Sequence, residues 1–420
     1  MTLLLNVMII KRERYLNELI GWMHTDLIKI VTGIRRCGKS FLLFNLFHNY
    51  LIGSGVDEDH IIEIALDDIG NEDLRNPFEM LSFVKERVKD KADYYLIIDE
   101  VQLLDRFAEV LNSFMHIPNL DVYVSGSNSR FLSTDVATEF RGRGIEIHVY
   151  PLSFAELYAA IGGDKYALWK RYYTYGGLPY VASLHDDSMK IDYLTALNQT
   201  LYLRDIIERN GVANAGTLSE LMCVMASAIG TSCNPNKIAN TFKSVKKESI
   251  APSTIAKYIS YMETAFILEK SVKYDIKGRK YIGTLPKYYF QDVGLRNALL
   301  NFRQVEETHI MENVIYNELR CRGYSVDVGM VEARTATERK QLEVDFVANK
   351  GDKRYYVQSA LTLPNPEKRE QELASLKRIN DSFNKIIIVR DDIVPYYDEN
   401  GVLIIGLMDF LLRTGKGDIM

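Results

Sequence analysis

Residues 33–40 carry the chemical groups that a nucleotide phosphate-binding loop needs. They read Gly-Ile-Arg-Arg-Cys-Gly-Lys-Ser and satisfy the pattern G-x-x-x-x-G-K-S. The two glycines let the backbone curl so that successive N–H groups point at phosphate oxygens. Lys39 is placed to reach the β- and γ-phosphates, and Ser40 to supply a hydroxyl to Mg²⁺. The pattern therefore predicts binding of a nucleoside triphosphate.

The segments on either side of this loop predict the strand and the helix that such a loop requires. Residues 27–31 form an apolar run typical of a buried strand, and residues 41–47 are typical of a helix. In this arrangement the helix N-terminus adds its positive end to the phosphate site. The residues predicted to contact the nucleotide are Gly33, Ile34, Arg35, Arg36, Cys37, Gly38, Lys39, Ser40 and Phe41.

A second motif, at residues 94–100, places two carboxylates at the end of an apolar run. Such a run is typical of a central parallel strand, which delivers its last side chains to the C-terminal edge of the sheet. We expect Asp99 to hold Mg²⁺ and Glu100 to polarise the attacking water. Because nucleotide binding alone needs only the metal-holding carboxylate, the second acid favours hydrolysis.

Two weaker signals follow the next predicted strand. Asn128 is the predicted γ-phosphate sensor and Ser127 the second choice, although Ser and Asn are also ordinary turn residues. Arg141 and Arg143 lie in a glycine-rich stretch, where either could act as an arginine finger, in its own subunit or a neighbour's. Arg143 is the residue we assign to that catalytic role. A solvated basic loop is the alternative.

The order of these motifs resembles that of the prokaryotic AAA-type ATPases with a C-terminal domain of unknown function. The resemblance extends from about residue 10 to the end of the chain. It implies that the nucleotide is ATP, bound by the loop lysine and serine and the two strand-end carboxylates, and it implies little about the biological role. The motifs that carry the resemblance are residues 33–40, 97–102, 125–128, 142–143, 150–157 and 175–179.

Length and composition agree with a protein of several domains. The chain has 420 residues, of which 47% are hydrophobic and 25% charged, with a net charge of −5. A chain of this length needs more than one core, and its charge confines any nucleic-acid binding to local patches. The four cysteines include no C-x-x-C pair, so neither a zinc site nor a disulfide framework is predicted. No apolar run reaches the roughly 20 residues of a membrane span, and we expect a cytoplasmic protein.

Three domains are predicted. Residues 1–160 alternate strands and helices, which predicts an α/β ATPase domain with a parallel sheet. Residues 161–300 contain a helical linker and then a pattern typical of a winged helix. Residues 301–420 predict an α/β nuclease-like domain. The elements expected in the winged helix are helices at 217–229, 236–243 and 253–265 and strands at 266–273 and 286–291.

The winged-helix segment is locally basic within an acidic chain. Such a patch favours contacts with the phosphates of DNA. The residues expected to face DNA are Lys257, Lys277, Arg279 and Lys280, with Thr254 and Tyr258 exposed beside Lys257 on the third helix. A winged helix used only for packing or for protein contacts is the alternative.

The last domain resembles a PD-(D/E)XK nuclease in which part of the catalytic set is replaced. Glu312 on a helix and Asp345 in a strand match its two acids, and Glu343 is the nearby acid that could substitute. The E-x-K positions of the next strand hold Gln358 and Ala360, which strand alternation places on one face. Such a nuclease needs carboxylates for Mg²⁺ and a cation for the phosphorane charge. We therefore expect a nuclease-like fold without nuclease activity.

Two functions fit these features. The first is a DNA-associated ATPase, in which ATP binding and hydrolysis reposition the winged helix and the nuclease-like domain. The second is a signalling ATPase whose C-terminal half binds a protein partner, with no DNA role. Homo-oligomerisation stays open, because an arginine finger acting in its own subunit or on a neighbour's nucleotide gives the same sequence. An active nuclease at the three acids is the remaining alternative.

Overall fold

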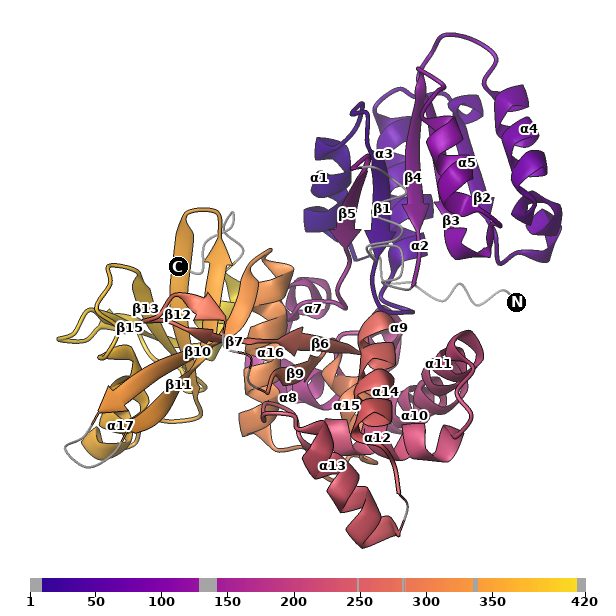
Figure 1. The fold of residues 1–420 in the computed structure, drawn as a ribbon. Helices are drawn as coiled ribbons and strands as arrows, with labels where there is room; N and C mark the ends of the chain where they lie inside the picture. Colours follow the sequence, from indigo (N-terminus) through magenta and orange to yellow (C-terminus); the bar gives the residue numbers. More distant parts are fainter. Residues whose placement is uncertain are drawn as a thin grey trace. The chain divides into compact units, whose positions relative to one another are not determined.

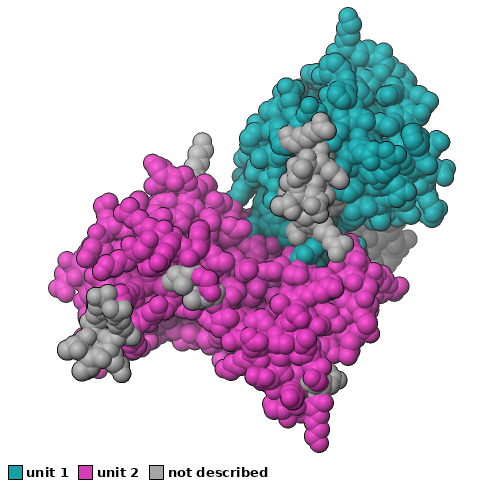
Figure 2. Space-filling model, in the orientation of Figure 1, with its two compact units in different colours: residues 1–151, 264–266 teal, residues 152–263, 267–420 magenta. Residues whose placement is uncertain are grey.

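The computed structural model describes residues 10–127, 142–247, 249–281, 283, 285–334 and 339–413. The chain divides into two compact units, coloured separately in Figure 2. Unit 1 comprises Met1–Pro151 and Thr264–Phe266, and unit 2 comprises Leu152–Glu263 and Ile267–Met420. In the part of the chain that is described, no helix combines the length and apolar character needed to cross a bilayer.

Unit 1 is built on a five-stranded sheet with the order β2-β3-β4-β1-β5, in which every neighbouring pair is parallel (Figure 1). The predicted parallel sheet of a P-loop NTPase is thus confirmed. All residues of β1, β3 and β4 are buried, because a parallel sheet is covered on both faces. The strands are β1 (Ile28–Thr32), β2 (Ile61–Ala65), β3 (Tyr94–Asp99), β4 (Leu120–Ser125) and β5 (Gly144–His148).

The helices of unit 1 follow the strands in alternation, as the sequence predicted. The phosphate-binding loop leads into α2, which continues without a break as a π-helical turn and then as α3. The helices are α1 (Glu13–Gly21), α2 (Lys39–Phe41), η1 (Leu42–Phe47), α3 (His48–Gly53), η2 (Glu58–His60), η3 (Ile69–Arg75), α4 (Pro77–Arg87), η4 (Val101–Leu103) and α5 (Phe107–Phe114).

The first part of unit 2 is helical. Its last three helices before the strands, α12 to α14, precede the antiparallel pair of β6 (Leu268–Ser271) and β9 (Lys287–Phe290), and Ser232 forms a bridge to Lys287. The helices are α7 (Phe154–Ile161), α8 (Lys165–Tyr175), α9 (Pro179–Ser183), α10 (Asp187–Ala196), η6 (Leu197–Tyr202), α11 (Leu203–Asn210), α12 (Ala215–Ser227), α13 (Pro235–Thr241), η7 (Phe242–Lys246), α14 (Pro252–Thr264) and α15 (Val293–Leu299).

The face that α14 presents differs from the prediction at Tyr258, and Thr254, also expected to be exposed, is half-buried. Tyr258 was expected to be exposed, and this is wrong: its side chain is only 8% exposed. Ile255, Ile259 and Met262 recur at helical spacing, and Tyr258 lies within the buried face that they define. Lys257 is exposed, as predicted.

The remainder of unit 2 contains an eight-stranded mixed sheet with the order β14-β15-β13-β12-β11-β10-β7-β8. Strands β7 and β8 come from the connection between β6 and β9, so the segment expected to form a wing is an edge of this sheet. The elements are β7 (Lys273–Asp275), β8 (Lys280–Tyr281), α16 (Glu307–Cys321), β10 (Ser325–Arg334), β11 (Arg339–Lys350), β12 (Lys353–Ala360), α17 (Pro366–Leu376), β13 (Asn384–Val389), β14 (Tyr396–Tyr397), β15 (Val402–Gly406) and α18 (Leu407–Leu412).

A buried aspartate explains the Gly-Gly pair in the motif at residues 175–179. The Asp292 carboxylate accepts hydrogen bonds from the N–H of Gly177 at 2.8 Å and of Leu295 at 2.9 Å. A Cβ atom at Gly176 would lie 2.2 Å from Asp292 Oδ1, and one at Gly177 would lie 2.3 Å from the Leu152 carbonyl oxygen. Burial raises the pKa of Asp292 to about 6, and the backbone N–H groups oppose that rise.

Replacing Asp292 with asparagine is expected to destabilise unit 2. The new NH₂ group would face N–H donors that the carboxylate now accepts from, and one unpaired donor at a buried site costs about 1–3 kcal/mol. Denaturant unfolding of the full chain measures this loss.

The matched control for that experiment is Asp164→Asn. Asp164 is exposed and caps α8 by accepting from the N–H groups of Tyr166 and Ala167. Asparagine caps a helix as well as aspartate does, so the control should change the free energy of unfolding by only a few tenths of a kcal/mol. Equal losses in the two variants would contradict the role given to burial.

Candidate functional site

The phosphate-binding loop lies between β1 and α2, at the C-terminal edge of the parallel sheet. Gly33 has a φ of +141° and Gly38 a φ of +102°, in the region that favours glycine. A Cβ atom at Gly33 would lie only 2.2 Å from the carbonyl oxygen of Val149. The first glycine is therefore required by close backbone approach as well as by its φ angle.

The side chain of Lys39 lies within the loop and is 5% exposed. Its ammonium donates to the carbonyl oxygens of Gly33 at 2.9 Å and Ile34 at 3.1 Å. These two carbonyls hold the positive charge inside the loop that the phosphates would enter. Among the other predicted nucleotide contacts, Cys37 is buried and Arg36 is exposed.

The second motif meets the loop through a hydrogen bond between Ser40 and Asp99. Ser40 Oγ donates to Asp99 Oδ2 at 2.6 Å, and Ser125 at the end of β4 donates to Asp99 Oδ1. Asp99 ends β3 and is 4% exposed. A hydroxyl and a carboxylate at this spacing fit Mg²⁺, which takes oxygen ligands and is completed by substrate phosphates and water.

A chain of hydrogen bonds joins the loop to Glu100. Arg35 Nε donates to Ser127 Oγ at 3.2 Å, and Ser127 Oγ donates to Glu100 Oε2 at 3.4 Å. The side-chain amide of Gln102 donates to the same carboxylate oxygen. Sequence reasoning identified Glu100 but assigned no role to Gln102, which lies in the same motif two residues later. These contacts hold the glutamate beside the loop.

Of the residue assigned as the γ-phosphate sensor and the two candidate arginine fingers, the structure describes only Arg143. Asn128 and Arg141 lie outside the described residues. Arg143 is exposed, and its carbonyl accepts from the N–H of Ile28, the first residue of β1. The phosphate-binding loop follows the other end of this five-residue strand, about 16 Å away at roughly 3.3 Å per residue. Arg143 therefore lies at the edge of the sheet opposite to the loop of its own subunit.

In unit 2, three of the predicted acids surround a lysine that sequence reasoning missed. Lys287 Nζ lies 3.1 Å from Glu312 Oε1 and 2.7 Å from Glu343 Oε1. Burial alone would lower the pKa of Lys287, but Glu312, Asp345 and Glu343 raise it above its ordinary value. Burial raises the pKa of Asp345 well above its usual range, Glu312 adds to this, and Lys287 opposes it.

Helix α16 places this lysine. The Asn313 side chain donates to the carbonyl oxygen of Phe290 at 2.7 Å and accepts from its N–H at 2.8 Å, which fixes β9 along the helix. Lys287, three residues earlier on β9, then meets Glu312. The two residues are 25 positions apart in the chain, so no motif spacing could have revealed the pair.

The two substituted nuclease positions contribute no charge to this cluster. The side-chain amide of Gln358 points to Glu372 of α17, at 3.4 Å. Ala360 packs in a hydrophobic core with Leu373 and Val389. Across the described ranges, no three His, Cys, Asp or Glu side chains converge as a metal site.

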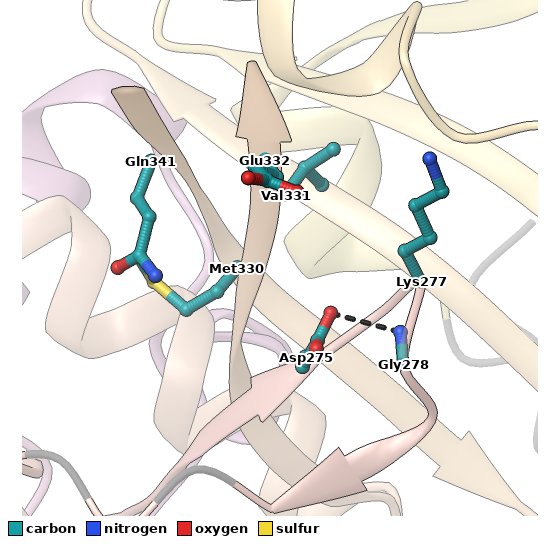
Figure 3. Close-up of a pocket in the computed structure, with 7 residues that line it drawn as sticks. All are labelled: Asp275, Lys277, Gly278, Met330, Val331, Glu332 and Gln341. Carbon is teal, nitrogen blue, oxygen red and sulfur yellow. Dashed lines mark hydrogen bonds between the residues drawn. The ribbon is translucent and has the colours of Figure 1, made fainter. Parts of the chain in front are cut away.

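A cavity of about 590 Å³ lies beside the turn between β7 and β8. Asp275 shapes this turn by accepting from the N–H of Gly278 at 2.9 Å, the hydrogen bond drawn in Figure 3. The lining carries charges of both signs, from Lys277 and from two acids, so it does not select for phosphate. The lining residues are Asp275, Lys277, Gly278, Met330, Val331, Glu332 and Gln341.

Comparisons with known proteins agree with the nucleotide site. The family model described as an AAA domain matches residues 25–158, and a domain of unknown function (DUF8612) matches residues 166–306. An uncharacterized protein of Haemophilus influenzae is 32% identical over 413 residues, covering 96% of this chain and 99% of its own length. An uncharacterized protein of Methanocaldococcus jannaschii is 26% identical over 416 residues, covering 94% and 88%.

Solved structures give weaker likenesses. The Aeropyrum pernix ORC1 protein, solved in complex with DNA, is 14% identical, with a TM-score of 0.30, and the match covers 70% of this chain and 93% of that one. A TM-score this low supports no argument about the partners of this chain.

Replacing Lys287 with methionine is expected to destabilise unit 2 by about 3–5 kcal/mol at pH 8, because it leaves the buried Asp345 and the mostly buried Glu312 without their nearest cation. At pH 5 the loss should be smaller, since burial raises the pKa of Asp345 and protonation of this acid removes part of the unpaired charge. Unfolding of the full chain by denaturant at the two pH values measures both effects.

Two further variants complete this test. Lys273→Met is the matched control, because Lys273 lies 3.5 Å from Oε2 of Glu343, the most exposed acid of the cluster, and its loss should cost less than about 1 kcal/mol. The double variant Lys287→Met/Glu312→Gln should recover part of the stability. A loss that is the same at both pH values would show that the lysine contributes packing and not charge.

Proposed function

This chain belongs to the family of its Haemophilus influenzae relative and carries an AAA-type P-loop ATPase domain, and from this premise we propose that it binds ATP with Mg²⁺ and hydrolyses it. The observation that carries the proposal is the 2.6 Å hydrogen bond between Ser40 and Asp99. It joins two motifs that lie 59 residues apart in the chain, at the point where a phosphate-bound Mg²⁺ is held in such sites.

The position of each side chain of the site supports a proposed role. Lys39 would exchange its two carbonyl partners for the β- and γ-phosphate oxygens. Ser40 and Asp99 would hold Mg²⁺, which would neutralise charge on the phosphates. The Glu100 carboxylate now accepts a hydrogen bond from the Ser127 hydroxyl. Once that hydrogen bond is released, Glu100 would orient the attacking water. The loop N–H groups would cradle the phosphates.

If Arg143 is the arginine finger, it would act between copies. Arg143 lies at the start of β5, whose first residue pairs with Ile28 at the edge of the sheet far from the loop. The proposal is therefore that Arg143 serves the nucleotide of a neighbouring copy in a homo-oligomer. Asn128 is retained as the proposed γ-phosphate sensor.

DNA association through a winged helix is the proposed role of part of unit 2. Three helices followed by an antiparallel pair, with Ser232 bridging to β9, support this topology. Exposed lysines lie on its second and third helices and the turn between them, and residues 235–262 of the sequence carry five lysines and a single acid, Glu248. The exposed lysines are Lys237, Lys243, Lys247 and Lys257.

One observation favours the alternative, a signalling ATPase whose C-terminal half binds a protein. The segment that would form a free wing is paired with β10 through Lys273, Tyr274 and Asp275. A wing held in a neighbouring sheet cannot enter a DNA groove by itself. Lys277, Arg279 and Lys280 remain exposed at this edge, so they could still contact phosphates.

The nuclease-like part is proposed to be inactive. The ammonium of Lys287 lies between Glu312 and Glu343, so it neutralises acids that would otherwise attract a metal ion. The ion pairs of Lys287 with Glu312 and Glu343 would then serve to hold β9 against α16 and β11.

Hydrolysis of ATP by the full chain tests the main proposal. Wild-type protein should turn over ATP in the presence of Mg²⁺. Lys39→Ala should lose both nucleotide binding and turnover. Glu100→Gln should bind ATP with unchanged affinity and lose about 10²-fold or more in kcat, because only the water-orienting group is removed. Turnover that persists in both variants would rule out this site.

Adding duplex DNA at low and high salt tests the choice of partner. For a DNA-associated ATPase, DNA should bind and stimulate turnover at low salt. The double variant Lys243→Gln/Lys257→Gln should lower the slope of log affinity against log salt by about 2. The double variant Lys277→Gln/Arg279→Gln removes the same number of positive charges. Its effect on the salt dependence shows whether the β7–β8 turn contacts DNA. If the protein does not bind DNA and DNA does not change ATP turnover at any salt concentration, a protein partner is favoured.

A further inference from the structure

Arg12 belongs to none of the sequence motifs, yet its guanidinium is buried against the phosphate-binding loop. The residue is 4% exposed. Its Nη1 donates to the carbonyl oxygen of Cys37 at 2.9 Å, and its Nη2 donates to that of Tyr150 at 2.5 Å. A planar guanidinium presents its donors in a rigid fork and so holds two carbonyls in fixed directions, whereas the three donors of a lysine ammonium rotate freely.

The contact with Cys37 fixes the orientation of one peptide of the loop. In a trans peptide the carbonyl and N–H bonds point in opposite directions. Because the Cys37 carbonyl points at Arg12, the N–H of Gly38 points away from it. Gly38 directly precedes Lys39, the first residue of α2. The N–H groups at this place are those that face the phosphates in such loops.

The contact with Tyr150 ties the same loop to the segment that follows β5. Tyr150 also donates its N–H to the hydroxyl of Tyr15 at 3.2 Å, and the guanidinium of Arg12 lies 4.7 Å from the centre of the Tyr15 ring. Arg12 has a φ of 44°, a left-handed conformation that is unfavourable for a residue with a side chain. Packing and hydrogen bonds thus determine the position of Arg12 from several sides.

We propose that Arg12 is a positioning residue for ATP, which acts by holding the peptide between Cys37 and Gly38 with its N–H directed at the phosphates. This inference rests on the proposed ATPase function of the same loop. It assigns to the N-terminal segment before α1 a part in nucleotide affinity that no motif indicates. Arg12 does not touch the reacting atoms, so its removal should affect binding more than the chemical step.

The test compares ATP binding and turnover in three forms of the full chain. Arg12→Lys keeps the charge and loses the rigid fork that holds the two carbonyls in place, so KM and the dissociation constant for ATP should rise about tenfold. The value of kcat at saturating ATP should stay within about twofold, because the catalytic groups are unchanged. Lys11→Ala is the matched control: its side chain is 81% exposed and contacts only the neighbouring Glu13 among the ion pairs described.

The split between KM and kcat separates positioning from stability. A variant that is merely less stable contains less folded enzyme, so it loses kcat and keeps its KM. Unchanged KM in Arg12→Lys, with or without a lower kcat, would overturn the proposal. Arg12→Gln, which is shorter, has a single NH₂ group and carries no charge, should raise KM at least as much as Arg12→Lys.

Equilibrium binding of ATP distinguishes this inference from the proposed function. If wild-type protein binds ATP and Lys39→Ala does not, the site is established, and equal affinity in Arg12→Lys refutes only the role of Arg12. If wild-type protein does not bind ATP, both proposals fail. A tenfold weaker affinity in Arg12→Lys with normal affinity in Lys11→Ala supports the inference.

Discussion

The segment between the two units is held by backbone contacts that leave no room for a side chain. In unit 1, the Val149 carbonyl oxygen would be 2.2 Å from a Cβ atom at Gly33. In unit 2, Leu152 donates its N–H to Gly177 at 2.7 Å, and its carbonyl oxygen excludes a Cβ there. The start of the phosphate-binding loop and the buried cap at Asp292 are thus each built on one end of residues 149–152. The geometry of the loop depends on the contact between Gly33 and Val149, and the geometry of the cap depends on the contact between Gly177 and Leu152.

The nucleotide site could be predicted from the sequence because its signals are local. The loop pattern, the apolar run before Asp99 and the strand–loop–helix order each lie within a dozen residues, and parallel strands bring their ends to one edge. The pairing of Ser40 with Asp99 follows from these rules alone. The positions of Arg12 and of Gln102 do not, because each depends on a carbonyl or a carboxylate whose direction is set only in the folded chain.

Features of unit 2 were missed where partners are distant in the chain. Lys287 meets Glu312 only because Asn313 fixes β9 along α16, and a sequence shows no such register. The pairing of β7 with β10 likewise joins segments separated by α15 and α16. The error at Tyr258 is of another kind: the apolar spacing around it was visible, and an aromatic residue on the buried stripe was assigned to the wrong face.

Strands β7 and β8 have a consequence for any attempt to divide this protein into fragments. A chain that ended near residue 300 would contain both strands without β10, the strand on which they pair. The complementary fragment would lack β7 and β8, so its sheet would have six strands in place of eight and a newly exposed edge at β10. Open edges recruit strands from other molecules. Fragments cut at that boundary should therefore aggregate or exchange strands, and co-expression of the two pieces is the route by which they could recombine.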